Sequence, residues 1–81
     1  LFNNTILTYG TNAPGIYLSN SCTYNVLSGN NVTTNNTGGK GIYLSTSTLN
    51  NVSNNLVSTI NANALALDTA AYNIFTSNKI G

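Results

Sequence analysis

The five residues Gly15–Ser19 (Gly-Ile-Tyr-Leu-Ser) decide the fold, because the same five residue types return at Gly41–Ser45. A third, more divergent copy (Ala-Leu-Ala-Leu-Asp) occupies residues Ala64–Asp68. The copies are separated by 26 and then 23 residues, and self-similarity at a nearly constant period of this size is typical of solenoids. We therefore interpret the chain as a stack of similar coils.

Two Asn-containing motifs recur in the same order between these copies. The Asn-x-aliphatic triplets are Asn4–Ile6, Asn30–Val32, Asn55–Val57 and Asn78–Ile80. The Asn-aliphatic pairs are Asn25–Val26, Asn51–Val52 and Asn73–Ile74. Turn-forming residues fill the segments Gly10–Pro14, Asn35–Gly39 and Ile60–Asn63. Each coil is thus expected to contain three short strands joined by turns.

Alternation within the strands predicts which side chains form the core. Ile16 and Leu18 share the inward face, and Tyr17 points outward. The same alternation turns the aliphatic residue of each triplet inward. The alignment of the Asn-aliphatic pairs predicts a further inward row, made of Val26, Val52 and Ile74.

These patterns predict a single all-β domain over residues 1–81, a right-handed parallel β-helix solenoid. It has about three coils of 22–26 residues, each with three short strands. The expected coils span residues 4–29, 30–54 and 55–77, and residues 78–81 begin another. Both ends of the chain interrupt the pattern. We therefore expect either a segment of a longer solenoid or a subunit that stacks end to end with identical chains.

The composition supports strands and excludes several partners. Only Lys40, Asp68 and Lys79 carry charge, whereas soluble domains carry about 25 per cent charged residues. Val, Ile, Thr and Tyr are abundant, and these residue types favour strands. Because there is no cluster of basic residues, we expect no nucleic-acid partner. No apolar run is long enough to cross a membrane.

The abundance of Asn has a structural explanation. Coils stacked about 4.8 Å apart place like residues over one another, where ladders of charged side chains would repel. Asn ladders instead form chains of amide hydrogen bonds, and Asn tolerates the left-handed conformation of sharp corners. We expect two such ladders, Asn4/Asn30/Asn55/Asn78 and Asn25/Asn51/Asn73.

The residue inventory argues against catalysis within this chain. There is no His, Glu or Arg, and Asp68 is the only carboxylate side chain. Two-carboxylate glycoside hydrolysis therefore has no residues here, and neither does a calcium-assisted lyase site. We expect no enzyme activity, no cofactor and no metal. Cys22 is interpreted as a small buried hydrophobic residue, and Asp68 as a solvated carboxylate.

Tyr17 and Tyr43 are the candidate ligand-binding residues. They are expected to stack on neighbouring coils of one outer face, where aromatic rings suit sugars. The alternative is that the pair only stabilises the sheet. Four Asn-x-Ser/Thr sequons are candidate N-glycosylation sites, at Asn3, Asn31, Asn35 and Asn51.

The order of motifs resembles a known repeat family. Asn-x-aliphatic, then Gly-Ile-Tyr-Leu-Ser, then Asn-Val is similar to the parallel β-helix repeat of the pectate-lyase-like superfamily. The closest resemblance is to the Asn-rich repeats of NosD-type and carbohydrate-associated β-helix proteins. It covers essentially the whole chain and implies a right-handed coil. The superfamily includes lyases, hydrolases, epimerases, adhesins and structural spikes, so the resemblance implies a fold more firmly than a function. It carries no copper role onto these residues.

We therefore expect a non-catalytic structural segment of an extracellular or cell-surface protein, or of a periplasmic one, serving as a shaft or filament section. One alternative is a carbohydrate-binding or carbohydrate-active β-helix with its catalytic residues outside this segment. Another is a self-assembling filament subunit that stacks through open ends. The expected partners are neighbouring coils of the same protein or identical chains, and polysaccharide.

Overall fold

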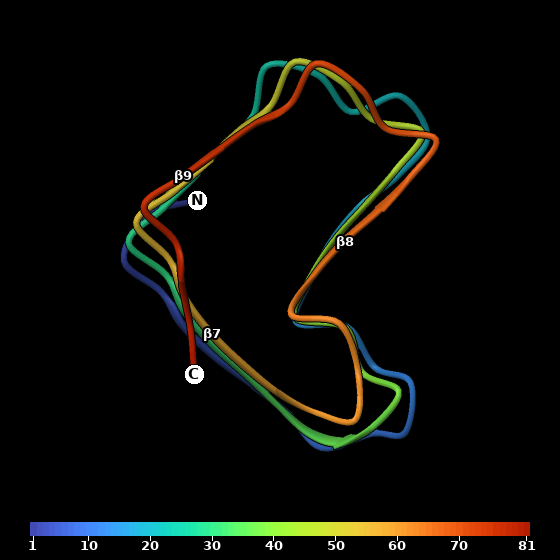
Figure 1. The fold of residues 1–81 in the computed structure, drawn as a ribbon, viewed down its shortest axis with the longest axis vertical. Coiled ribbons are helices and arrows are strands. Elements are labelled where there is room, and N and C mark those ends of the chain that lie inside the picture. The colour runs from blue at the N-terminus through green and yellow to red at the C-terminus, as the bar shows by residue number, and fades with distance from the viewer.

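The computed structural model describes all of residues 1–81 and contains ten short β-strands and no helix. The strands form three parallel sheets, and the order of strands in each sheet follows successive coils. Figure 1 looks down the stack and shows the coils lying over one another with nearly the same outline. The chain is a β-solenoid of about three turns, which confirms the all-β parallel β-helix; its right-handedness stays a prediction. Nothing helical in the structure has the length and hydropathy that crossing a membrane requires.

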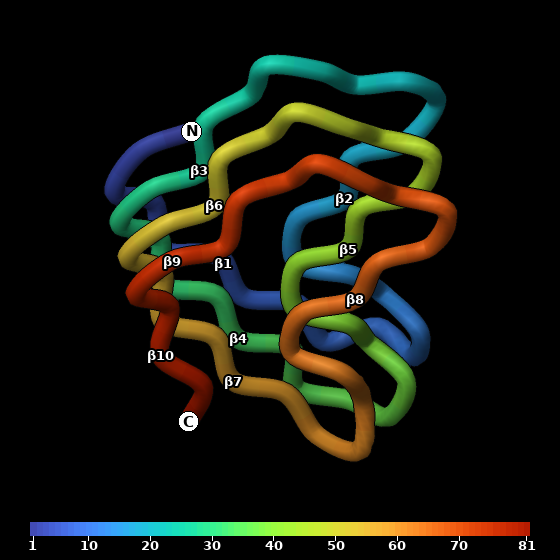
Figure 2. Tube along the Cα trace, turned by 45° about the horizontal axis from the view of Figure 1, so that its top comes forward, coloured from blue at the N-terminus to red at the C-terminus, as the bar shows by residue number.

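Figure 2 shows the three sheets as three stacks of strands on different sides of the coil. The first sheet contains β1 (Thr5–Thr8), β4 (Asn31–Thr37), β7 (Leu56–Ile60) and β10 (Lys79–Ile80). The second sheet contains β2 (Ile16–Leu18), β5 (Ile42–Ser45) and β8 (Leu65–Asp68). The third sheet contains β3 (Val26–Ser28), β6 (Asn51–Ser53) and β9 (Ile74–Thr76).

The second sheet has the register that the repeated pentapeptide predicts. Ile16 pairs with Ile42 and Tyr17 with Tyr43, and β5 continues in register into β8. The aliphatic residues of this sheet point inward, and the central ones, such as Ile42 and Leu44, are completely buried. In the last coil Leu67 keeps the inward position but is 53% exposed, because no further coil covers it in this chain. At the other edge of this sheet Ile16 and Leu18 stay buried, at 7% and 9% exposure, so the two end strands are not equivalent.

The third sheet corrects one predicted register. Val26 pairs with Asn51, which pairs with Ile74, so the inward row is Leu27, Val52 and Phe75. Val26 and Ile74 point outward and are 39% and 57% exposed. Of the predicted inward row, only Val52 points into the core. The error is one residue, and in a strand a shift of one residue moves every side chain to the opposite face.

The first Asn ladder forms as predicted and runs through the corner before the first sheet. Asn55 Oδ1 accepts hydrogen bonds from the backbone N–H and the Nδ2 of Asn30, at 2.9 and 3.0 Å. Asn55 itself donates from both groups to Asn78 Oδ1, and its Nδ2 also reaches Leu27 O at 2.9 Å. Asn4 donates to Asn30 in the same way. Asn30 and Asn55 are almost completely buried, so the amides replace water at an interior corner.

The second ladder passes through Asn50 and not through the predicted Asn51. Asn25 donates from its backbone N–H and Nδ2 to Asn50 Oδ1, and Asn50 repeats both bonds to Asn73. Asn51 lies one residue further on and is exposed. The physical reason is the corner: the residue before each ladder Asn has a positive φ, as at Leu49 (60°) and Tyr24 (59°). The amide that follows this left-handed residue is the one that points inward.

The turn after the first sheet is stabilised by Thr hydroxyls. Thr8 Oγ1 donates to Ala13 O, Thr34 Oγ1 to Gly39 O, and Thr59 Oγ1 to Ala62 O. β4 continues to Thr37 with a register irregularity against β7, so Asn35 belongs to a strand and not to the predicted turn. These turns differ in length between coils, and Figure 1 shows the coil outlines separating there.

Gly41 is required by close packing between two sheets. A Cβ at this position would overlap Val57 Cγ1 and would lie 2.5 Å from Ala64 O. Gly15 lies one coil before Gly41, and a Cβ there would overlap Val32 in the same way. The glycine that begins each of these pentapeptides therefore leaves room for the buried valine of the following coil.

Replacing Asn55 with Ala is expected to lower the free energy of unfolding by about 2–4 kcal/mol, because the donors of Asn30 and the carbonyl of Leu27 lose their partner. Urea unfolding followed by circular dichroism measures the loss. Asn31→Thr is the control, because Asn31 is exposed and Thr5 occupies the same row, and it should change stability by less than about 0.5 kcal/mol. Equal losses in the two variants would contradict the structural role of the ladder.

Gly41→Ala is expected to destabilise the fold by about 1–3 kcal/mol, because the added methyl group overpacks the core at Val57. Gly10→Ala is the matched control, since its Cβ would meet only Ala13 Cβ at 3.3 Å. Thermal unfolding of both variants tests the difference. A Gly41→Ala protein as stable as the control would rule out the close packing described above.

Candidate functional site

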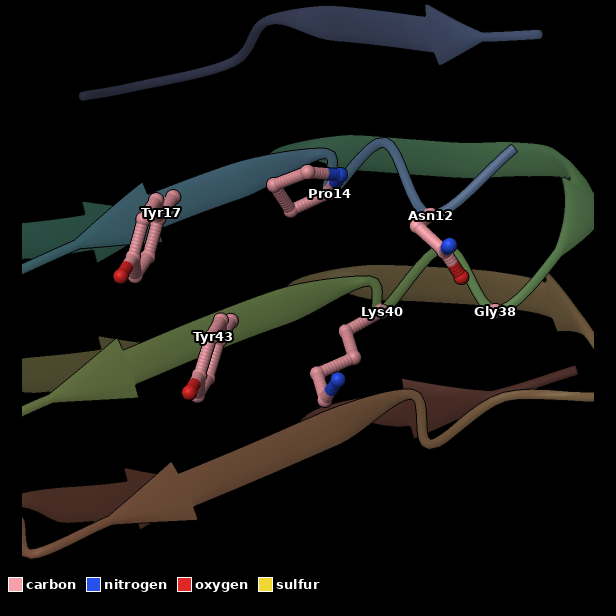
Figure 3. Close-up of a pocket in the computed structure, with 6 residues that line it drawn as sticks. All are labelled: Asn12, Pro14, Tyr17, Gly38, Lys40 and Tyr43. Atoms are coloured by element: carbon pink, nitrogen blue, oxygen red, sulfur yellow. The ribbon is translucent and has the colours of Figure 1, made fainter. Parts of the chain in front are cut away.

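The stacked pair of Tyr17 and Tyr43 is the centre of the candidate site. Their ring centroids are 4.8 Å apart and their planes differ by 5°. This distance is the spacing of neighbouring strands, so the stack follows directly from the pairing of β2 with β5. Figure 3 shows the two rings parallel to each other, one on each strand. The sequence prediction that these rings stack is therefore confirmed, and their role in sugar binding stays a prediction.

A pocket lies beside the two rings, and Figure 3 shows the residues that line it. Its volume is about 180 Å³. Its lining consists of three repeat positions, each present in two neighbouring coils: Asn12 with Gly38, Pro14 with Lys40, and Tyr17 with Tyr43. The pocket is thus a product of the repeat, formed where one coil stacks on the next.

The turn side of the pocket depends on a close approach between Asn12 and Gly38. Gly38 has a φ of 81°, and a Cβ there would overlap Asn12 Oδ1. Figure 3 shows the Asn12 side chain directed toward Gly38. The backbone N–H of Asn12 also donates to Thr37 O at 3.1 Å. The backbone of Asn12 is therefore bonded to the turn of the next coil, and its side chain lines the pocket.

Lys40 supplies the positive charge of the pocket. Its Nζ lies 5.0 Å from the centroid of the Tyr43 ring, a cation–π geometry that contributes about 0.5–1 kcal/mol at an exposed site. Asp68, the only acidic side chain, accepts hydrogen bonds from Tyr43 Oη at 3.4 Å and from Thr69 Oγ1 at 3.3 Å. The carboxylate thus lies at the hydroxyl end of Tyr43 and is not part of the pocket lining.

The pocket combines an aromatic wall, an amide and an ammonium group. Groups of these kinds can bind and orient a ligand, and they include no nucleophile with a base beside it. Sequence reasoning found the two Tyr residues but missed Asn12, Pro14 and Lys40. The sequence contained a signal for two of these residues, because Pro14 and Lys40 occupy the same repeat position, three residues before a stacked Tyr.

The pocket ends at the third coil. Ala66 pairs with Tyr43 and takes the position of the aromatic row, and Asn63 occupies the position of Lys40. The backbone carbonyl of Asn63 accepts a hydrogen bond from Gly41 N–H, so the coil itself continues unchanged. The loss of the aromatic ring and of the charge confines the site to the first two coils.

The remaining candidate residues lie elsewhere on the surface. Cys22 is half-buried and its Sγ donates to Ser19 O at 3.0 Å, as fits a residue packed at the edge of the core. The four sequon residues are all exposed, and their glycosylation stays a prediction; they are Asn3, Asn31, Asn35 and Asn51.

The fold defines the chain as a parallel β-solenoid repeat protein. A family model described as "Periplasmic copper-binding protein (NosD)" matches residues 3–81, so the chain belongs to the NosD family. This confirms the resemblance on which the fold prediction partly depended. No curated protein and no solved structure matches the chain.

A double-mutant cycle with Tyr17→Leu and Tyr43→Leu measures what the ring stack contributes to stability. We expect a coupling energy of about 0.5–1.5 kcal/mol, as aromatic pairs contribute beyond the area that they bury. The cycle requires urea unfolding of the two single variants, the double variant and the parent chain. A coupling energy of zero would mean that the rings gain nothing from being stacked.

Proposed function

We propose that this chain is a structural, non-catalytic section of an exported β-helix protein, acting as a stiff shaft. The proposal depends on one observation: the Asn side chains buried at the corners donate hydrogen bonds to the Asn of the next coil. No buried side-chain polar atom in the structure lacks a hydrogen-bond partner. The buried side chains therefore include no unpaired polar atom that is free to bind a ligand. The family description as periplasmic supports an exported location, in the periplasm or outside the cell.

Copper binding does not fit the residues of this chain. Copper in proteins is held by thiolate, thioether and imidazole ligands. The sequence has no His and no Met, and Cys22 is its only thiol. No group of three or more His, Cys, Asp or Glu residues comes together in the structure. The copper role in the family description is therefore not proposed for these residues.

A second candidate function is carbohydrate contact at the Tyr17–Tyr43 pocket. The observation that favours it is the ring stack, in which Tyr17 is exposed and Tyr43 half-buried, with an amide side chain and a cation beside it. Shaft and carbohydrate contact are compatible, because the pocket lies on the outer surface and uses none of the interior ladders.

Trypsin tests the stiffness of the proposed shaft at a defined bond. The chain has only two Lys residues and no Arg, so the internal target is the Lys40–Gly41 bond. We expect strong resistance there, because Lys40 O accepts from Gly15 N–H and Gly41 N–H donates to Asn63 O. The segment around Lys40 and Gly41 must break its hydrogen bonds to both neighbouring coils before it can enter the active site of a protease.

The rate of cleavage after Lys40, followed by mass spectrometry, should be at least about 100-fold lower in buffer than in urea that unfolds the chain, because a protease reaches only the opened fraction. The Asn55→Ala variant should be cleaved at an intermediate rate. Equal rates in buffer and in urea would overturn the stiff-shaft proposal.

A further inference from the structure

We propose that Tyr17 and Tyr43 form an oxidative cross-linking site, at which a peroxidase supplied with hydrogen peroxide joins the two rings into a dityrosine. The link holds the first coil to the second by a covalent bond on their outer faces. The inference goes beyond the stiff shaft and does not depend on carbohydrate contact. It rests on the geometry of the ring stack, on the freedom of Tyr17 to move and on the carboxylate beside Tyr43.

The stack holds the two rings in the arrangement that coupling requires. The ring centroids are 4.8 Å apart and the ring planes differ by 5°. Figure 3 shows both hydroxyl groups pointing the same way, so the ortho carbons of the two rings lie at the same end of the stack. Because Tyr17 pairs with Tyr43 in the register of β2 and β5, the rings stay neighbours as long as the coils are paired. A radical formed on one ring therefore has a second phenol ring beside it.

The coupling reaction balances with one molecule of hydrogen peroxide. Each phenol gives up one electron and its hydroxyl proton and becomes a neutral phenoxyl radical with spin density on its ortho carbons. A carbon–carbon bond forms between an ortho carbon of Tyr17 and one of Tyr43, and the hydrogen on each of these carbons then moves to the oxygen of its own ring. Both phenols are restored, and the pair has lost two hydrogen atoms. The two electrons and two protons reduce the peroxide to two molecules of water.

Tyr17 has the freedom that bond formation needs. The new bond is much shorter than the stacking distance, so one ring must tilt toward the other. β2 is an edge strand of the second sheet, and Tyr17 is 53% exposed. Its side chain can therefore move without displacing a strand on its outer side, while Tyr43 lies on the central strand β5. Tyr17 is also the ring of the stack that an oxidant reaches more easily from solvent.

Two charged side chains beside Tyr43 act on its oxidation in opposite directions. Tyr43 Oη donates a hydrogen bond to Asp68 Oδ2 at 3.4 Å, so a carboxylate is in position to accept the proton that oxidation releases. Lys40 Nζ lies 5.0 Å from the centroid of the Tyr43 ring, and a cation there opposes the removal of an electron. We therefore expect Tyr17 to lose the first electron and Tyr43 the second.

The chain contains a second pair of tyrosines that is more exposed but not stacked. Tyr24 and Tyr72 each precede a ladder Asn and are 77% and 83% exposed. Leu49 has the same position in the coil between them, since it precedes Asn50. The two rings are thus two coils apart, which is about 10 Å at the spacing of neighbouring strands. This pair is a matched control for the stack.

The test compares two variants of the chain that keep two tyrosines each. The stacked variant carries Tyr9→Phe, Tyr24→Phe and Tyr72→Phe, so that only Tyr17 and Tyr43 remain. The spaced variant carries Tyr9→Phe, Tyr17→Phe and Tyr43→Phe, so that only Tyr24 and Tyr72 remain. Phe keeps the ring of each replaced residue and removes the hydroxyl group, and circular dichroism verifies that both chains are folded.

Each variant is treated with peroxidase and hydrogen peroxide, its monomer is isolated by size-exclusion chromatography, and trypsin digests the monomer in urea. Cleavage after Lys40 and Lys79 separates residues 1–40 from residues 41–79, and each of these fragments contains one tyrosine in either variant. A cross-link holds the two fragments together as one species, two hydrogen atoms lighter than their sum, which mass spectrometry detects. We expect this linked species from the stacked variant and its loss in the spaced one.

Two results would overturn the cross-linking site. One is linked fragments in similar amounts from both variants, because the stack would then not direct the coupling. The other is linkage of the stacked variant only in covalent dimers and not in its monomer. Adding Asp68→Asn to the stacked variant should slow formation of the linked species several-fold, and an unchanged rate overturns the role of Asp68 as proton acceptor.

The link should also stabilise the stack of coils. Tyr17 and Tyr43 are 26 residues apart, so the bond closes a loop in the unfolded chain and lowers its entropy. The linked monomer of the stacked variant should therefore unfold at a urea midpoint about 1 M higher than the untreated monomer. An unchanged midpoint in the linked monomer contradicts this stabilising role.

Discussion

The amide hydrogen bonds of the Asn ladders are the interaction on which this structure depends. A coil only three short strands long must bend sharply, and each bend brings backbone groups into the interior without a strand to pair them. Asn55 meets this need with a single side chain, since its Oδ1 accepts from the coil before while its Nδ2 donates to the coil after and to Leu27 O. Burial of the corner therefore costs little, because its donors and acceptors are paired.

The ladders also determine what the outer surface displays. Because they fix the register of every coil, an outward residue stands directly over its counterpart in the next coil. Two like residues at one repeat position become a contiguous surface, as Tyr17 and Tyr43 do. The pocket beside them needs no dedicated loop, since Pro14 and Lys40 come together by the same stacking. Outward residues can therefore differ between coils while the interior ladders stay the same, as Ala66 does in the row of Tyr17 and Tyr43.

The sequence predicted the coil, the second sheet and the first ladder because identical residues recur there at one period. It was wrong by one residue in the third sheet, where Asn50-Asn51 offered two candidates for one corner. What decides which Asn joins the ladder is the left-handed residue before it. Leu49 and Tyr24 have a positive φ, although Leu and Tyr rarely adopt one, so the residue types gave no sign of it. Of the pocket lining only the two Tyr residues were predicted, because Lys40 joins them through its position beside Tyr43 in space. Applying the repeat alignment to the turns as well as the strands would have found it.

A fold held at its corners by amides has nothing there to titrate. Stability changes with pH only through groups that bind different numbers of protons in the folded and unfolded states. Asn side chains neither gain nor lose protons in ordinary conditions, and the ladders contain no ion pair for salt to screen. Such a solenoid keeps the same internal bonds whether the surrounding medium is acidic or alkaline, dilute or saline. That independence suits the exported location proposed for this chain.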